Sequence, residues 1–245
     1  AYAGVTSFQK ESDGITCTLD QGLLKIKICS DRMVEVKYTT LPILMDKASL
    51  VFVPGWKPAV NFSVTDNDKE IRLATDKLVV VVDKKTNAIR YLTPSGEEIL
   101  SEDSSRGKTM TQATVADIPT YTISTLFNSP RQEALYGLGC HPEDSLSINY
   151  KGRDQWMTIK YMTGAIPVML STRGYGLIWD NYSPSSFFGA EANNTQFRYE
   201  SESGTMVDYY FIYGPEFDKI IADYRDATGG TPMFPKWSFG LFQSQ

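Results

Sequence analysis

Histidine and cysteine are scarce in this 245-residue chain, which contains one His and three Cys. A single imidazole, His141, cannot supply a multi-histidine metal site or a catalytic pair of histidines. The cysteines, Cys17, Cys29 and Cys140, are an odd and sparse set. If residues 20–23 form a tight hairpin, Cys17 faces Ile26 rather than Cys29, so a disulfide between these two is out of register. We therefore expect buried, free thiols, and we expect no metal and no cofactor.

Long apolar runs and basic clusters are also missing. The apolar run at 78–82 is far shorter than the roughly 20 residues that cross a bilayer, so we expect no membrane span. The 24 Lys and Arg residues are outnumbered by 29 Asp and Glu residues, and no basic cluster could neutralise a row of phosphates. Nucleic acid is therefore excluded as a partner. No signal-peptide pattern precedes Ala1, so such a segment is either absent or already removed.

Short alternating segments occupy most of the chain, which is 42% apolar and 22% charged. Apolar and polar residues alternate with a period of two, the pattern of half-buried strands. The predicted strands cover 15–19, 23–29, 32–39, 59–65, 70–76, 78–83, 86–92, 119–127, 133–138, 156–162, 166–171, 175–181, 196–200 and 205–213. The first three form a meander. So many short strands favour an all-β fold in which two antiparallel sheets pack as a sandwich.

One segment has a helical pattern instead. Residues 214–230 carry apolar side chains at helical spacing, a proline in the first turn and two glycines at the end. We expect a helix there that leads out of the sandwich. Residues 229–235 contain two glycines and two prolines, and we place a domain edge within them. The apolar segment 236–245 then has the character of a strand without a partner.

Several polar or glycine-rich motifs have simple structural interpretations. The acids at 97–98 and 102–103 flank turn residues and are expected on solvated turns. Gly137 and Gly139 do not fit a phosphate-binding loop, and a bulge or tight packing explains them better. Trp179 is expected to point inward from a central strand, with turn hydrogen bonds from Asp180 and Asn181.

Three segments carry a more specific signal. They read EALYGLGCHPEDSLSINYKGRD at 133–154, IPVMLSTRGYGLIWDNYS at 166–183, and FIYGPEFDKIIADYRDATGGTPMFPKWSFGLFQSQ at 211–245. Together they resemble the N-terminal region of glycoside hydrolase family 31, the retaining α-glucosidase and α-xylosidase family. The resemblance is most specific from Glu133 onward, whereas the first 130 residues match in character more than in motif.

The resemblance implies a galactose-mutarotase-like sandwich at 1–213, a helix and linker at 214–235, and at 236–245 the first strand of a (β/α)₈ barrel that is otherwise missing. In the family, the nucleophile and the acid/base are aspartates on later barrel strands, so no catalytic residue is expected in this chain. Retaining hydrolysis needs two carboxyl groups about 5–5.5 Å apart, which a barrel presents from its strand ends. The chain alone is expected to be inactive, with the barrel as its partner.

The resemblance also implies substrate contacts from a loop of this domain. Gly152, Arg153 and Asp154 match an Asn-Arg-Asp stretch of many α-glucosidases, with a departure at the first residue. Asp154 is the predicted acceptor for sugar hydroxyls, with Trp156 and Tyr161 as walls of the pocket. The alternative is that Arg153 and Asp154 form an ordinary loop ion pair and that Trp156 is core. No role is assigned to Cys140 or His141.

Three functions stay open. The first is a non-catalytic domain that shapes the substrate pocket and supports the barrel of an α-xylosidase or α-glucosidase, which acts on oligosaccharide or polysaccharide fragments in the periplasm or after secretion. The second is a stand-alone carbohydrate-binding module, which needs an exposed aromatic platform on one sheet. The third is a mutarotase-type epimerase, which needs a general acid and a general base, for which this chain offers a single histidine.

Overall fold

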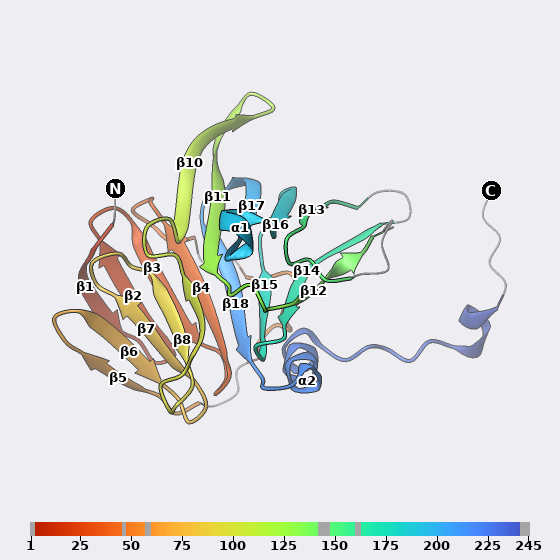
Figure 1. Ribbon diagram of the computed structural model, residues 1–245, viewed down its shortest axis with the longest axis horizontal. Helices are drawn as coiled ribbons and strands as arrows, with labels where there is room; N and C mark the ends of the chain where they lie inside the picture. Colours follow the sequence, from red (N-terminus) through yellow and green to blue (C-terminus); the bar gives the residue numbers. More distant parts are fainter. Residues whose placement is uncertain (1–2, 46–47, 57–59, 142–147, 160–162, 241–245) are drawn as a thin grey trace.

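The computed structural model describes residues 3–45, 48–56, 60–141, 148–159 and 163–240. These residues form strands in two sheets whose paired strands are all antiparallel, so the predicted all-β sandwich is confirmed (Figure 1). The predicted meander over 15–39 is confirmed as three consecutive strands, β2, β3 and β4.

The first sheet has the spatial order β1-β2-β3-β4-β18-β15-β14-β12. Its strands are β1 (Val5–Lys10), β2 (Gly14–Leu19), β3 (Leu23–Ile28), β4 (Met33–Thr39), β12 (Leu135–Cys140), β14 (Gly164–Ser171), β15 (Tyr175–Trp179) and β18 (Val207–Tyr213).

The second sheet has the order β13-β16-β17-β11-β9-β8-β7-β6-β5, and β10 pairs with β11. Its strands are β5 (Ser63–Asp66), β6 (Glu70–Ala74), β7 (Val79–Asp83), β8 (Ile89–Leu92), β9 (Glu98–Glu102), β10 (Lys108–Val115), β11 (Ile118–Asn128), β13 (Asp154–Met157), β16 (Ser185–Phe188) and β17 (Gln196–Gly204).

Aromatic side chains from both sheets fill the space between them. The rings of Tyr91 and Phe211 stack with centroids 3.9 Å apart, and Trp179 stacks on Tyr199 at 5.4 Å. Trp179 is 1% exposed, which confirms its predicted inward position on a central strand. Large aromatic side chains bury the most apolar area per residue, so these contacts between sheets stabilise the sandwich strongly.

A buried polar network crosses the same core. Glu102 accepts a hydrogen bond from the Tyr209 hydroxyl at 2.6 Å and forms an ion pair with Lys108, and both charged side chains are fully buried. The Tyr91 hydroxyl lies 2.8 Å from that of Tyr209. The prediction of a solvated turn was therefore wrong for Glu102, because it ends β9 and points into the core. Asp103 does accept hydrogen bonds within the following turn.

Four strands were missed: β1, β9, β10 and β16. The hairpin of β10 and β11 extends beyond the sandwich (Figure 1), so most of β10 is exposed on both faces and shows no clear alternation. β16 has only four residues, and β1 lies at the edge of its sheet. Periodicity is a weak signal for strands that are short, at an edge or solvated on both sides.

The cysteines are free, as predicted, but two details were wrong. Cys17 lies opposite Leu24 rather than Ile26, because the turn closes at Leu19 and Gly22, where the Leu19 N–H donates to the Gly22 carbonyl. Cys17 is buried like Cys29, and burial raises the pKa of each thiol to about 12. Cys140, at the end of β12, is exposed.

The predicted helix is confirmed as α2 (Phe217–Thr228), which lies against the outer face of the first sheet through Ile220 and Ala227. A four-residue turn, α1 (Glu191–Asn194), was not predicted, because residues 192–194 have left-handed backbone angles that no periodicity indicates. None of the helices in the described part of the chain has the length and apolar character needed to span a bilayer.

The predicted strand at 236–245 is not formed by its described residues. Lys236–Phe239 form a short 3₁₀ helix, η1, after an extended segment that leaves the sandwich (Figure 1). The Ser238 N–H bonds to the Pro235 carbonyl at 3.0 Å. Without a neighbouring strand, a backbone satisfies its polar groups by such local hydrogen bonds. Trp237 and Phe239 are both 77% exposed.

A group of charges is buried on the outer face of the first sheet. The register puts Lys37 opposite Asp208 and Glu35 opposite Tyr210. The Lys37 ammonium lies 2.9 Å from Glu35 and 3.6 Å from Asp208. Directly after β15, the Asp180 N–H donates to the Asp208 carbonyl at 3.0 Å. Glu35 and Asp208 therefore share one well-buried ammonium group, and the buried Asp180 follows β15, the strand beside β18.

Two of these buried carboxyl groups, Asp180 and Asp208, have raised pKa values. Burial raises the pKa of Asp180, an effect that the hydroxyls of Ser49 and Tyr182 partly offset. Burial, and then the charge of Glu35, raise the pKa of Asp208. The predicted turn hydrogen bonds of Asp180 and Asn181 are replaced by other contacts: the Asn181 amide donates to the Asp208 carbonyl on the neighbouring strand β18, and the Asp180 carboxyl is buried.

We predict that Asp180→Asn raises the free energy of unfolding at pH 8, on the order of 1 kcal/mol. A carboxyl group whose folded pKa is raised stabilises the fold when protonated, and this contribution is lost as pH rises through the folded pKa. The gain should disappear near pH 4, where the wild-type carboxyl is protonated. Urea denaturation at both pH values measures the effect, with exposed Asp117→Asn as the control. Equal effects at both pH values would contradict the assignment.

Candidate functional site

Three of the four predicted site residues, Arg153, Asp154 and Trp156, lie within residues 148–157, a turn and strand β13 that come between β12 and β14 in the chain. β13 pairs with β16, placing Asp154 opposite Phe188 and Trp156 opposite Ser186. It is the last strand at that edge of the second sheet. An edge strand pairs on one side only, so its other side is accessible to a ligand or to another domain.

Asp154 and Trp156 lie on the same face of β13, because side chains two residues apart in a strand point the same way. Asp154 is exposed, and Trp156 is 50% exposed. The Oδ1 atom of Asp154 accepts a hydrogen bond from the Gly189 N–H at 3.1 Å, which fixes the carboxylate. The alternative that Trp156 is core was wrong. Tyr161, the other predicted wall, lies outside the described residues.

Arg153 belongs to the turn rather than to this face. Its guanidinium lies over the ring of Tyr150, 5.5 Å from the centroid. The backbone of the turn is closed by hydrogen bonds from the Arg153 N–H to the Tyr150 carbonyl and from the Gly189 N–H to the Arg153 carbonyl, both at 3.1 Å. A Cβ atom at Gly189 would meet the Tyr150 and Arg153 carbonyl oxygens at 2.1 and 2.4 Å. Only glycine permits this approach.

His141 holds β13 from the other side. Its Nε2 lies 2.8 Å from the Leu138 carbonyl, and its Nδ1 lies 3.3 Å from the amide nitrogen of Gln155. Leu138 has a positive φ, and the register of β12 with β14 shifts between Gly137 and Gly139, so the predicted bulge is confirmed. Both imidazole nitrogens are thus engaged in structural contacts, which counts against the epimerase hypothesis.

A buried carboxylate supports the start of the segment. Glu133, 3% exposed, accepts hydrogen bonds from the hydroxyls of Ser129, Ser171 and Tyr175. Burial, and then the charge of Glu133, raise the pKa of Tyr175 far above its ordinary value, so its hydroxyl stays protonated and donates. The ammonium of Lys151 donates to the Ser129 carbonyl at 3.1 Å and to its hydroxyl, which ties the 149–154 turn to this network.

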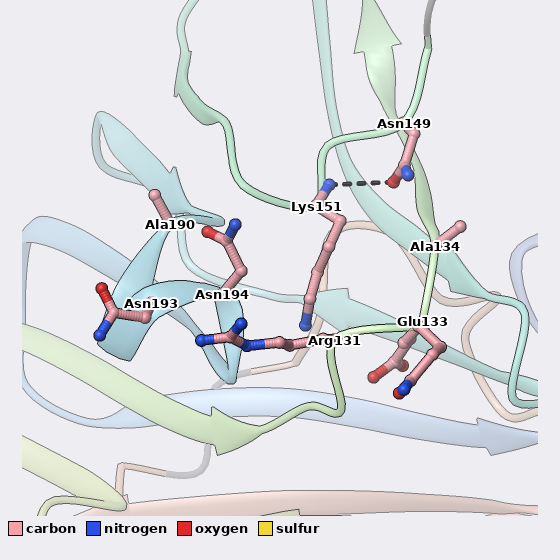
Figure 2. A pocket seen from close by; sticks show the side chains of 9 residues that line it. Arg131, Glu133, Ala134, Asn149, Lys151, Ala190, Asn193 and Asn194 are labelled. Atoms are coloured by element: carbon pink, nitrogen blue, oxygen red, sulfur yellow. Dashed lines mark hydrogen bonds between the residues drawn. The ribbon is translucent and has the colours of Figure 1, made fainter.

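A polar cleft of about 630 Å³ lies beside the turn. Its other walls are α1 and the connection from β11 to β12 (Figure 2). Figure 2 shows the side chains of Arg131 and Lys151 extending into it, with Asn193 and Asn194 on the α1 side. Its lining residues are Arg131, Gln132, Glu133, Ala134, Asn149, Lys151, Ala190, Asn193 and Asn194.

Comparison with known proteins identifies the family. Residues 23–187, about two thirds of the chain, match the profile of the glycosyl hydrolase 31 N-terminal galactose mutarotase-like domain. The chain belongs to this family. The resemblance stated from the sequence is therefore confirmed, and the sandwich is the N-terminal domain type found in glycosyl hydrolase 31 glycosidases.

Individual relatives agree with this assignment. An α-xylosidase of Saccharolobus solfataricus is 32% identical over 136 residues, which are 53% of this chain and 18% of the relative. An isomaltosyltransferase of Sporosarcina globispora is 30% identical over 200 residues, 75% of this chain and 18% of the relative. The chain thus spans less than a fifth of these curated relatives.

Solved glycosyl hydrolase 31 structures share the fold. An α-xylosidase from Xanthomonas citri superposes with a TM-score of 0.84 at 17% identity, covering 95% of this chain and 41% of that one. A dextranase of Flavobacterium johnsoniae, solved with isomaltotriose, gives 0.81 at 21% identity, covering 98% and 30%.

Sequence reasoning missed the supporting residues of this glycosyl hydrolase 31 domain. Glu133 and Lys151 lie within the segment that carries the resemblance. The hydroxyls that bond to Glu133, and the serine that accepts from Lys151, are brought to them only by the packing of β11, β12, β14 and β15. The cleft was also missed, because its residues come from three separate stretches. Local sequence contains no signal for such convergence, apart from the asparagine pair, which tolerates left-handed backbone.

We predict that Glu133→Gln lowers the free energy of unfolding by about 1–3 kcal/mol. The amide keeps the volume but replaces one acceptor oxygen with a donor, so at least one buried hydroxyl loses its acceptor. The midpoint of urea denaturation measures this, and Glu98→Gln, exposed at the start of β9, is the matched control. An unchanged midpoint for Glu133→Gln would contradict the network.

Proposed function

We propose that this chain is the non-catalytic N-terminal domain of a retaining α-glycosidase, an α-xylosidase or α-glucosidase that acts on oligosaccharides, and that β13 forms part of its substrate pocket. One observation carries the proposal: Asp154 and Trp156 share an exposed face of an edge strand. A carboxylate accepts hydrogen bonds from sugar hydroxyls, and an indole ring packs against the C–H face of a sugar ring.

The course of the chain supports the same proposal. The segment after α2 leaves the sandwich as an extended chain, on the side of the fold where β12, β13 and β14 lie (Figure 1). A barrel that followed residue 235 would therefore stand next to β13. The domain division, with a sandwich at 1–213, a linker at 214–235 and the first barrel strand from 236, is part of this proposal. The exposed Trp237 and Phe239 would be covered there.

The acids near β13 fit a contact role better than a catalytic one. Asp154 is exposed and bonded to the backbone of Gly189, whereas Glu133 is buried and bonded to three hydroxyls. Retaining hydrolysis requires two carboxyl groups facing one sugar, tuned to different pKa values. These two acids do not share a solvent-accessible face.

We predict that the purified 245-residue chain releases no nitrophenol from 4-nitrophenyl α-xyloside or α-glucoside. A full-length, active glycosyl hydrolase 31 α-xylosidase, assayed in parallel, is the positive control. Hydrolysis by the chain alone, above the rate without protein, would overturn the non-catalytic assignment.

We also predict that, in the full-length enzyme, Asp154→Asn lowers kcat/KM about tenfold, the usual effect of losing a hydrogen bond to a charged group. Asparagine keeps an acceptor oxygen for the Gly189 N–H, so the turn should be retained. Trp156→Ala should raise KM, and Trp156→Phe should restore most of the loss. Asp117→Asn, at the tip of the hairpin of β10 and β11, is the control. Unchanged kinetics for both Asp154→Asn and Trp156→Ala would contradict a pocket role for β13.

A further inference from the structure

The polar cleft beside the 149–154 turn has an excess of positive charge. Its lining includes two cationic residues, Arg131 and Lys151, and one acid, Glu133. The acid is 3% exposed, and its oxygens accept hydrogen bonds from three hydroxyls, so little of it faces the cleft. The chain as a whole has a net charge of −5, which makes a cationic cleft a local departure.

Arg131 is available for a ligand. Its side chain is exposed, and no carboxylate of the described residues forms an ion pair with it. Figure 2 shows its guanidinium reaching across the cleft toward the α1 wall. A guanidinium presents parallel N–H donors whose geometry matches a carboxylate.

Lys151 adds a partly desolvated charge on the same side of the cleft. Burial lowers the pKa of Lys151, and the charge of Glu133 offsets part of this effect. Ser129 accepts two of its hydrogen bonds, which fixes the ammonium in place. A desolvated cation gains more from an incoming anion than one fully in water.

The opposite wall carries amides at a strained backbone. Ala192, Asn193 and Asn194 have φ values of 47°, 57° and 64°. Left-handed backbone costs about 1–2 kcal/mol at an ordinary residue, less at asparagine, and such strain gathers at ligand sites. The side chains of Asn193 and Asn194 are exposed and line the cleft. Amides both donate and accept, which suits hydroxyl groups.

We propose that this cleft binds a sugar that carries a carboxylate, with the carboxylate between Arg131 and Lys151 and hydroxyls on Asn193 and Asn194. In this arrangement the two cations pair with the carboxylate, and the amides form hydrogen bonds with the sugar hydroxyls. Because a guanidinium binds phosphate as well as carboxylate, inorganic phosphate is a comparison ligand in the test. The site is distinct from the Asp154 and Trp156 face and does not rest on the function proposed above.

The test is calorimetric titration of the 245-residue chain with D-glucuronate, with D-glucose, acetate and inorganic phosphate as comparison ligands. We expect glucuronate to bind and the other three to bind at least tenfold more weakly, with affinity falling as NaCl is raised. An oligosaccharide with a terminal glucuronic acid tests the source of the ligand. If it binds more tightly than free glucuronate, the ligand is a glucuronic acid branch of a polysaccharide; otherwise it is the free sugar acid.

Variants locate the site. Arg131→Gln should weaken glucuronate binding about tenfold. Asn194→Gly keeps the left-handed backbone and removes the amide, and should reduce the preference for glucuronate over acetate. Arg72→Gln, at the far end of the second sheet, is the matched control and should bind normally. Absence of glucuronate binding, equal binding of glucose or of acetate, tighter binding of phosphate, or full binding by Arg131→Gln would each overturn the proposal.

Discussion

The sandwich depends on a charged pair that is buried where the two sheets meet. Glu102 ends β9 in the second sheet, and its carboxylate contacts Lys108 from β10 and the hydroxyl of Tyr209 from the first sheet. Burying two charges is favourable only when each is paired and hydrogen-bonded, and loss of one partner costs about 3–5 kcal/mol. The Ile89 N–H and the Asn87 carbonyl complete the set of partners. The network therefore fixes how the aromatic layers of the two sheets face each other.

Much of this fold could be predicted from the sequence, because half-buried strands impose a period of two on their residues. β3 and β6 show it plainly, with buried and partly exposed residues in alternation. The prediction failed where burial depends on distant partners. Glu102 was expected on a solvated turn because its neighbours in sequence are polar, but its partners come from β10 and β18. The expected strand after residue 235 needs a hydrogen-bonded neighbour, and its described residues instead form a 3₁₀ turn.

In the candidate site, too, some residues could be predicted from the sequence and others could not. Asp154 and Trp156 could be found from the family resemblance, and strand periodicity explains why they share one face. Their support could not be found, because Gly189, Lys151 and Glu133 act through contacts that only the folded chain creates. Arg131 and the asparagines of α1 were missed for the same reason. A short motif can indicate which residues touch a ligand, whereas the residues that hold them come from elsewhere in the fold.

The close approach at Gly189 limits how this domain can change. Two carbonyl oxygens lie where a methyl group would have to fit, so residue 189 has no freedom to accept a side chain without moving the backbone that bears Asp154. The side chains of Asp154 and Trp156, in contrast, are exposed. If β13 lines a sugar pocket as proposed, substitutions at 154 and 156 would change which sugar it accepts, while residue 189 stays glycine.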